Sequence, residues 1–396
     1  MRNMSSKNDM QPTQAFDEID KAALLARSPF SSPTPPRQAF DEIDKGTLLG
    51  FTSIIGFDLG HGEFSLFQAS DEQNDSARCI EINNQRSQIT AIAIRPDGGI
   101  LIGNRAITTY DDAAITVGFK RRPGENLDFD RLIGLFFAEV LKSALAEGKI
   151  NPSSNTLILV GCPTEWDKEC QMRYQTILHE AIRDLPCNEK LAVAVIPESR
   201  AAIQCARRSG QFSIDELQAR AVSLLDFGSS TVDATLLQSG QDIHDVDDGC
   251  DLGAFLLDEL IVFEALREQD EKTRARICDA MRYRISNLGR CLLRAREVKE
   301  AYFNMPEFKE NRLITRGVID IESRDANIDY LDIRLTMNRI RELIEETPLS
   351  CIEASVRSWN LPEELLFFPP PEYVNLSYGA AMTKFLESVR RKTEQG

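Results

Sequence analysis

Two segments of this chain share one pattern: an apolar strand ending at an aspartate, a turn containing glycine, and a second strand that returns beside the first. The first segment is Ile54–Phe67 with Asp58 before the turn, and the second is Val222–Leu237 with Asp226 before the turn. Such a turn gathers backbone N–H groups around an anion, and an aspartate at the strand end can hold a hydrated cation. Two copies in one chain predict a duplicated fold whose halves close on the phosphates of a nucleotide from both sides.

The composition narrows the class of protein. A chain of 396 residues can bury a large core and form two or three lobes. Its net charge of −16, with no basic run to offset it, argues against general binding to nucleic acid or to an acidic membrane. Nine scattered cysteines without a Cys-x-x-Cys pair are typical of buried thiols in a reducing compartment. No signal peptide or membrane-spanning apolar run is apparent, so we expect a cytoplasmic protein.

Residues 1–52 are predicted to form a disordered tail. An octapeptide occurs in it twice, at Gln14–Lys21 and at Gln38–Lys45, and each copy is followed by a pair of leucines. A proline-rich linker between the copies should stay extended. Two interpretations remain open: the repeated phenylalanine and isoleucine line a short helix that docks in a partner protein's groove, or the repeat is a simple duplication in a disordered segment.

From residue 53 onward, apolar strands alternate with amphipathic helices, which is typical of α/β lobes. The expected strands are 54–69 as a hairpin, 89–94, 100–103, 156–161 and 191–196, and the expected helices are 128–148, 168–183 and one that opens at 197–202. The second hairpin begins another round, with a helical stretch at 254–304, polar strands at 311–334, and helices at 335–358 and 374–391. We therefore divide the chain into a first lobe, 53–220, and a second lobe, 221–396, whose upper helical subdomain covers about 254–335.

Seven segments, in order along the chain, resemble the ATPase domain of the heat-shock seventy (DnaK-like) chaperones, which belongs to the actin-like ATPase superfamily. Gly56–Gly60 and Asp226–Asp233 are similar to the two phosphate loops of that family. The others are Phe119–Gly124, similar to the segment with the catalytic lysine, Ile196–Ala202, similar to the segment with the catalytic glutamate, and Leu252–Asp258, Leu335–Leu343 and Tyr378–Ala381, similar to three helical segments.

The resemblance implies a two-lobed actin-like fold with duplicated ribonuclease-H-like lobes, and it implies ATP and Mg²⁺ as ligands. Asp58 and Asp226 would hold Mg²⁺ through its waters, Lys120 would balance charge on the terminal phosphate, and Glu198 would polarise the attacking water. The resemblance counts all four as catalytic. The nucleotide-binding residues that it implies are Gly60, His61, Gly62, Gly228, Ser229, Ser230, Thr231 and Lys299.

Three departures from the family pattern bear on these expectations. His61-Gly62-Glu63 stands where the family has hydroxyl residues in its first loop. Arg296 replaces the acid of the helix that faces adenine in the family, so of that motif only Lys299 persists. The segment Leu361–Pro371 replaces a buried strand and the glycine pair that packs on adenosine, and the family's peptide-binding domain does not follow.

Two functions from different classes therefore stay open. The favoured one is an ATP-binding, slowly hydrolysing chaperone-like switch, a possible ATPase that acts with a protein partner or co-chaperone. The alternative is a degenerate, non-hydrolysing scaffold that acts through protein–protein contacts, because the adenosine motif is missing and the first loop is altered. A filament-forming relative of actin and a sugar kinase are less well supported by the sequence.

Overall fold

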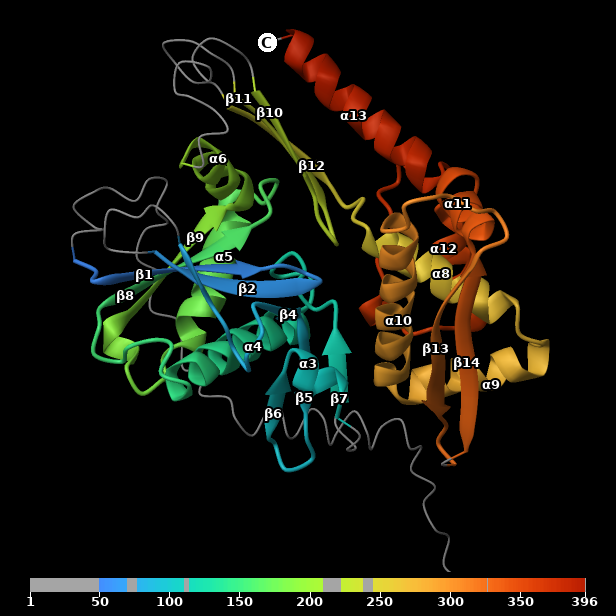
Figure 1. Ribbon diagram of the computed structural model, residues 1–396, viewed down its shortest axis with the longest axis horizontal. Coiled ribbons are helices and arrows are strands. Elements are labelled where there is room, and N and C mark those ends of the chain that lie inside the picture. The colour runs from blue at the N-terminus through green and yellow to red at the C-terminus, as the bar shows by residue number, and fades with distance from the viewer. Residues whose placement is uncertain are drawn as a thin grey trace, which may run out of the picture.

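The computed structural model describes residues 50–69, 77–109, 114–208, 222–237, 245–325 and 327–395. The fold is mixed α/β, with helices packed on several sheets (Figure 1). Both copies of the repeated octapeptide lie outside the described residues. Of the predicted tail the structure describes residues 50–52, where the Thr52 amide donates to Asn155 O at 2.9 Å.

The first half is built on a six-stranded mixed sheet. Its strands are β1 (Ser53–Leu59), β2 (Glu63–Gln68), β3 (Arg78–Ile80), β4 (Ser87–Ile89), β8 (Thr156–Cys162) and β9 (Leu191–Pro197). The order is β3-β2-β1-β8-β9, with β4 also paired to β2. The β1–β2 pair is the predicted hairpin and is antiparallel, whereas β1, β8 and β9 run parallel. The carboxyl ends of three parallel strands therefore lie at one edge of the sheet.

Helices of the first half cover this sheet where the sequence predicted them. They are α4 (Leu127–Ala146), α5 (Lys168–Ala181) and α6 (Glu198–Arg208), with a short turn η1 (Asn188–Lys190) before β9. The Asn126 side chain caps α4 by accepting hydrogen bonds from the first-turn amides. Phe137 of α4 stacks on Phe57 of β1 at 5.3 Å between ring centroids, and both are fully buried. Removing such a ring typically costs about 3–5 kcal/mol.

A second, three-stranded sheet with the order β6-β5-β7 lies below the first one in Figure 1. Its elements are β5 (Ala91–Ile94), β6 (Ile100–Ile102), β7 (Ala114–Val117) and the short helix α3 (Asn104–Ile107). The single strand predicted at 89–94 is thus divided between two sheets at Thr90. The backbone changes sheet there because Thr90 bonds to the β1–β2 turn, with its hydroxyl on Gly60 O at 2.7 Å and its amide on Gly62 O at 3.0 Å.

The second half opens on an antiparallel meander, β10 (Val222–Phe227), β11 (Val232–Leu237) and β12 (Asp245–Cys250), in the order β10-β11-β12. The first two strands are the second predicted hairpin, paired from Val222↔Leu237 to Phe227↔Val232. Within the described residues β10 is an edge strand, and Leu225 and Phe227 on it are 42% and 57% exposed. The segment 365–368 does not extend this sheet; it packs elsewhere, as described below.

The helical stretch predicted at 254–304 is three helices, α8 (Phe255–Arg267), α9 (Glu271–Tyr283) and α10 (Ile285–Phe303). The Asp270 side chain caps α9 on its first-turn amides and so marks a break that apolar periodicity alone does not. The remaining elements are β13 (Leu313–Glu322) paired with β14 (Ile328–Thr336), then α11 (Met337–Glu345), α12 (Ser350–Trp359), the turn η2 (Glu363–Leu365) and α13 (Tyr378–Gln395).

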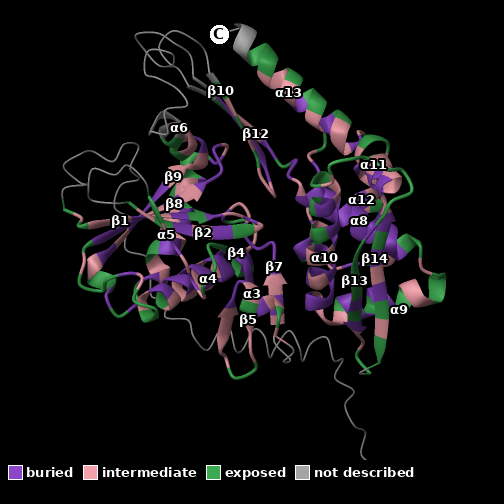
Figure 2. Ribbon diagram, in the orientation of Figure 1, coloured by how far each residue is buried: buried purple, intermediate pink, exposed green. Residues whose placement is uncertain are grey.

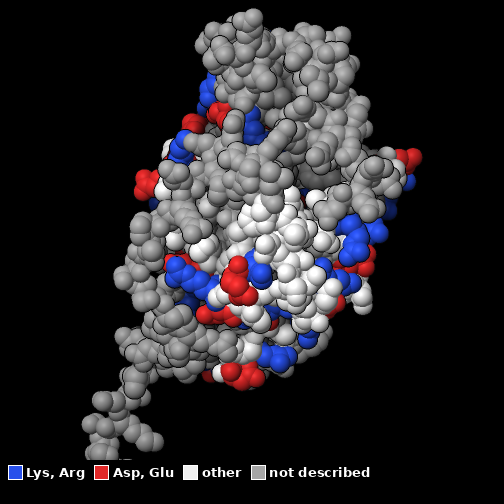
Figure 3. Space-filling view, turned by 90° about the vertical axis from the view of Figure 1, so that its left-hand side faces the viewer, with Lys and Arg blue, Asp and Glu red and all other residues white. Residues whose placement is uncertain are grey.

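The two halves meet along α10, which packs on β7 of the first half as well as on α8 and β13 of its own half. Buried residues follow the inner faces of both halves and nearly the whole of α8 (Figure 2). On the face seen in Figure 3, acidic side chains (red) and basic side chains (blue) of the described residues lie next to one another. Among the described helices, none combines the length and the apolar character needed to span a bilayer.

Candidate functional site

Three acidic residues come together where strands end. Asp58 lies near the end of β1, Glu198 directly follows β9 as the first residue of α6, and Asp226 lies near the end of β10. Between them lies Lys120, whose Nζ bonds to Glu198 Oε1 at 2.9 Å while its side chain is only 4% exposed. Gly161 of β8 makes room for this pair, because a Cβ there would lie 2.9 Å from Glu198 Cγ.

The charges of this group are out of balance. Burial and then repulsion from Glu198 raise the pKa of Asp58, with a further contribution from Asp226. Burial and the same glutamate also raise the pKa of Asp226. Burial disfavours the Lys120 ammonium, but the carboxylates of Glu198 and Asp58 outweigh it, so the pKa of Lys120 is raised and its charge is fixed. One cation against three carboxylates creates a site that a further cation would stabilise.

The turn between β1 and β2 is held by its carbonyl oxygens. Thr90 donates to Gly60 O and Gly62 O, and Arg296 Nη1 of α10 donates to Gly62 O at 2.8 Å. The amide N–H groups of His61 and Gly62 donate to no described residue. Gly60 is required by the tightness of the turn, since a Cβ there would lie 2.6 Å from Glu63 O. The turn is therefore anchored on one side and keeps two free donors on the other.

The turn between β10 and β11 is anchored in the same way. Gly253, Ala254 and Phe255, at the start of α8, donate their amides to Ser230 O at 3.0 Å, Gly228 O at 3.1 Å and Ser229 O at 2.8 Å. The amides of Ser229 and Ser230 themselves donate to no described residue. Successive backbone amides that are left free in a turn of this kind are typical of an anion-binding site.

The two turns lie against each other. A Cβ at Gly62 would lie 3.3 Å from Ser229 Oγ and 2.9 Å from Arg296 Nη1, so the first turn, the second turn and the guanidinium meet at one point. Arg296 also pairs with Glu63 at 2.5 Å and with Glu300 at 2.6 Å. Sequence reasoning identified Arg296 only as a departure from the family pattern, and it missed the anchoring roles of Thr90 and Gly253.

Thr231 and Asp233 form a buried group behind the second turn. The Thr231 hydroxyl donates to Asp233 Oδ2 at 2.8 Å, and the amides of Thr164 and Glu165 donate to Asp233 Oδ1 at 3.0 and 3.3 Å. Burial outweighs these bonds and raises the pKa of Asp233 to about 6. The threonine predicted to hold a phosphate thus directs its hydroxyl to this aspartate, while Gly228 and both serines lie in the turn itself.

His61 and Lys299 have internal partners. The His61 ring is 5% exposed, and its Nδ1–H donates to Lys120 O at 3.0 Å. Its edges meet the rings of Phe255 and Phe367 at 4.9 and 4.8 Å between centroids. Lys299 Nζ donates to Ala254 O at 2.7 Å and to Asp258 Oδ2 at 2.9 Å, with both side chains buried. The lysine predicted to face adenine therefore fixes the start of α8, next to the second turn.

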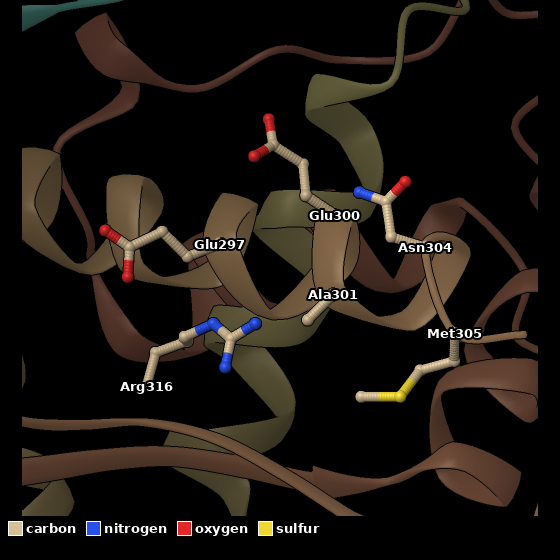
Figure 4. A pocket seen from close by; sticks show the side chains of 6 residues that line it. All are labelled: Glu297, Glu300, Ala301, Asn304, Met305 and Arg316. Atoms are coloured by element: carbon tan, nitrogen blue, oxygen red, sulfur yellow. The ribbon is translucent and has the colours of Figure 1, made fainter.

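A cavity of about 390 Å³ lies beside α10, and Figure 4 shows its lining. The lining residues are Glu297, Glu300, Ala301, Asn304, Met305 and Arg316. None of the predicted site residues is among them. Among the described residues it is linked to the first turn through Glu300, the partner of Arg296.

A direct metal centre is not formed by the residues that the structure describes, since no three His, Cys, Asp or Glu side chains among them are close enough to hold an ion. Comparisons with known proteins add no family assignment. No protein-family model matches the chain. No curated protein matches it either.

Proposed function

We propose that this chain is an ATP-binding, slowly hydrolysing nucleotide switch that resembles the ATPase domain of heat-shock seventy chaperones and acts with a protein partner. One observation carries the proposal: two strand turns from different halves touch each other, each with its carbonyls anchored and its amides free. Asp58, Asp226, Lys120 and Glu198 lie beside these turns. Such an arrangement suits a polyphosphate with a bound cation better than any neutral ligand.

Each residue then has a defined task in the proposed reaction. The amides of His61, Gly62, Ser229 and Ser230 would bind the phosphate oxygens. Lys120, charged and buried, would lie close to the transferred group and neutralise its charge. Glu198 gives one carboxylate oxygen to Lys120 and keeps the other to accept a proton from the attacking water.

The donor set fits hydrated Mg²⁺ and not a metal held directly by protein. Asp58 and Asp226 come from different strands, and burial and the nearby Glu198 raise the pKa of both, so a divalent cation would stabilise their charged forms. Mg²⁺ retains most of its waters, and two carboxylates are sufficient to hold it through them. When bound, Mg²⁺ would neutralise charge that develops on the phosphates.

The architecture supports the actin-like interpretation in the meanders and departs from it elsewhere. Both halves open on an antiparallel meander, β1 with β2 and β3, and β10 with β11 and β12. The first meander continues into the parallel strands β8 and β9, whereas no described strand continues the second one beyond β10. Within the part of the chain that the structure describes, the second half therefore shows only part of the proposed duplicated lobe, and the adenosine motif is also missing from its sequence.

A second candidate function, a scaffold that binds partners without hydrolysis, is favoured by the internal partners of Thr231 and Lys299. Both side chains are expected to bind nucleotide, yet they hydrogen-bond to Asp233 and Asp258. Lys299 is thus bound to Asp258, and Arg296, the other cation of the family's adenine-facing motif, holds the first turn.

Calorimetry and phosphate release together test the proposal. Wild-type protein is titrated with ATP in Mg²⁺ or in EDTA, and release of radiolabelled phosphate is followed for wild type, Glu198→Gln and a control, Glu189→Gln, an exposed glutamate before β9. We expect Mg²⁺-dependent micromolar binding throughout, and release slowed at least about 100-fold only in Glu198→Gln. Absence of binding would refute the nucleotide switch. Binding with equal release rates would refute the catalytic assignment and favour the scaffold.

A further inference from the structure

The segment Leu361–Phe367, here called the strap, replaces the strand and glycine pair that the family resemblance predicts. It contains the turn η2, and Leu361, Leu365 and Leu366 on it are at most 4% exposed. Leu365 packs beside Gly289 of α10, and the Phe367 amide donates to the Glu259 carboxylate of α8. The strap is therefore part of the second half.

The first half also holds the strap, through Arg121. Its Nη1 donates to Leu366 O at 2.9 Å, and its guanidinium lies 4.0 Å from the centroid of the Phe367 ring. Its Nε donates to Gly118 O at 3.3 Å, next to the end of β7. A planar guanidinium that stacks on a ring and binds the neighbouring carbonyl fixes both the distance and the orientation of the two halves at this point.

Phe367 and Arg121 are each connected to the candidate site through one neighbouring residue, which is His61 for Phe367 and Lys120 for Arg121. The Phe367 ring packs on His61, which lies in the first turn between its two glycines. His61 Nδ1–H in turn donates to the carbonyl of Lys120, the residue that precedes Arg121 and pairs with Glu198. Movement of the strap would therefore displace the first turn and Lys120 together.

We propose that Arg121 and Phe367 are positioning residues which couple the seating of the strap between the two halves to the geometry of the phosphate-binding turn. This inference rests on the proposed function, because the geometry it protects is that of the proposed nucleotide site. Neither residue touches the phosphates in this scheme; both act through His61 and Lys120. Seating of the strap aligns the free amides of the turn, and its release disorders them.

Affinity for MgATP, measured by calorimetry on the full chain, tests the inference. Phe367→Leu and Arg121→Lys are each expected to weaken binding by about 10-fold or more, since small misplacements of a binding group have effects of this size. Phe367→Tyr keeps the aromatic ring and should bind MgATP with wild-type affinity. Phe368→Leu and Arg122→Gln are the matched controls, since Phe368 is 39% exposed and Arg122 pairs with the exposed Asp167. If Phe367→Leu does not fold, the MgATP affinity of Arg121→Lys tests the inference by itself.

A double-mutant cycle separates positioning from a general structural effect. If Phe367 acts through His61, Phe367→Leu in a His61→Gln background should weaken MgATP binding less than about 2-fold further. The inference would be overturned if the losses of MgATP affinity in the two single variants multiplied in the double variant, or if the single variants bound MgATP as tightly as wild type. Either result would leave the proposed function intact. A wild-type protein that binds no MgATP would overturn the proposed function, and the inference would fall with it.

Discussion

Replacing His61 with glutamine is expected to make the protein more resistant to acid than the wild type. His61 is buried between two aromatic rings, and no described residue bonds to its Nε2. Burial is the main cause that lowers the pKa of this ring from 6.5 to about 3, and the nearby Arg121 and Lys120 add to it. The folded protein therefore keeps His61 neutral in mild acid, whereas the unfolded chain binds a proton there.

The sign and the size of the effect follow from this difference. Below pH 6.5 only the unfolded state takes up the proton, so the free energy of unfolding falls as the pH falls, down to about pH 3. The full difference between the two pKa values corresponds to about 5 kcal/mol, because one pKa unit is worth about 1.4 kcal/mol. Between pH 7.5 and pH 5, the range used in the experiment, the free energy of unfolding is expected to fall by about 2 kcal/mol.

Urea unfolding followed by tryptophan fluorescence measures this loss, since Trp166 lies in the first half and Trp359 in the second. The comparison is the change in unfolding free energy between pH 7.5 and pH 5 for wild type and for His61→Gln. Asp233, Asp258 and Glu165 have raised pKa values and act with the opposite sign, but they are common to both proteins and cancel in the difference. His179→Gln, at an exposed site in α5, is the control. Equal slopes for wild type and His61→Gln would refute the reasoning.

Three further predictions follow from other contacts. Gly253→Ala places a Cβ 2.2 Å from Ser229 O, so it should displace the second turn and abolish MgATP binding in calorimetry, whereas Gly289→Ala, with 3.5 Å to its nearest neighbour, should bind normally. Asp58→Asn and Asp226→Asn remove a buried carboxylate and its repulsion from Glu198, so each should raise the thermal midpoint of the free protein and eliminate Mg²⁺-dependent binding; a lowered midpoint would contradict the electrostatic account. Burial raises the pKa of Glu259, so the stability associated with its neutral form is present near pH 4.5 and is lost as the pH rises. Glu259→Gln should therefore be more stable than wild type at pH 8 in urea unfolding, and a difference that grows toward acid would contradict this.

Regular apolar patterns predicted the α/β class and many of the individual strands and helices. The hairpins at β1–β2 and β10–β11, the buried strands β8 and β9 and the helices α4 and α5 are confirmed within a few residues of their expected bounds. Phe129, Leu132, Phe136, Val140 and Ala144, expected on one face of the first long helix, are all buried. These elements were predictable because a local period fixes both their type and their buried face.

The elements that the sequence did not predict depend on distant contacts. β12 is rich in aspartate, with Asp245, Asp247 and Asp248 in six residues, and forms a strand because β11 offers a pairing edge. The division of strand 89–94 at Thr90 follows from its bonds to the first turn. At the site, the residue types at strand ends indicated Asp58, Asp226 and Glu198, but the clamp of Arg296 on Gly62 joins residues far apart in sequence and has no local signal.

The strands of the two meanders differ in how far apart in the sequence their pairing partners lie, and this difference affects the order in which the strands form during folding. Among the described residues, β10, β11 and β12 pair with strands next to them in sequence, whereas β1 must find β8 in the register Ser53↔Thr156 across an intervening sheet and helix. Closing the longer loop costs more chain entropy and slows contact formation. We therefore expect amides of β10 and β11 to become protected from hydrogen exchange before those of β8 during refolding, although the ribosome makes β8 first.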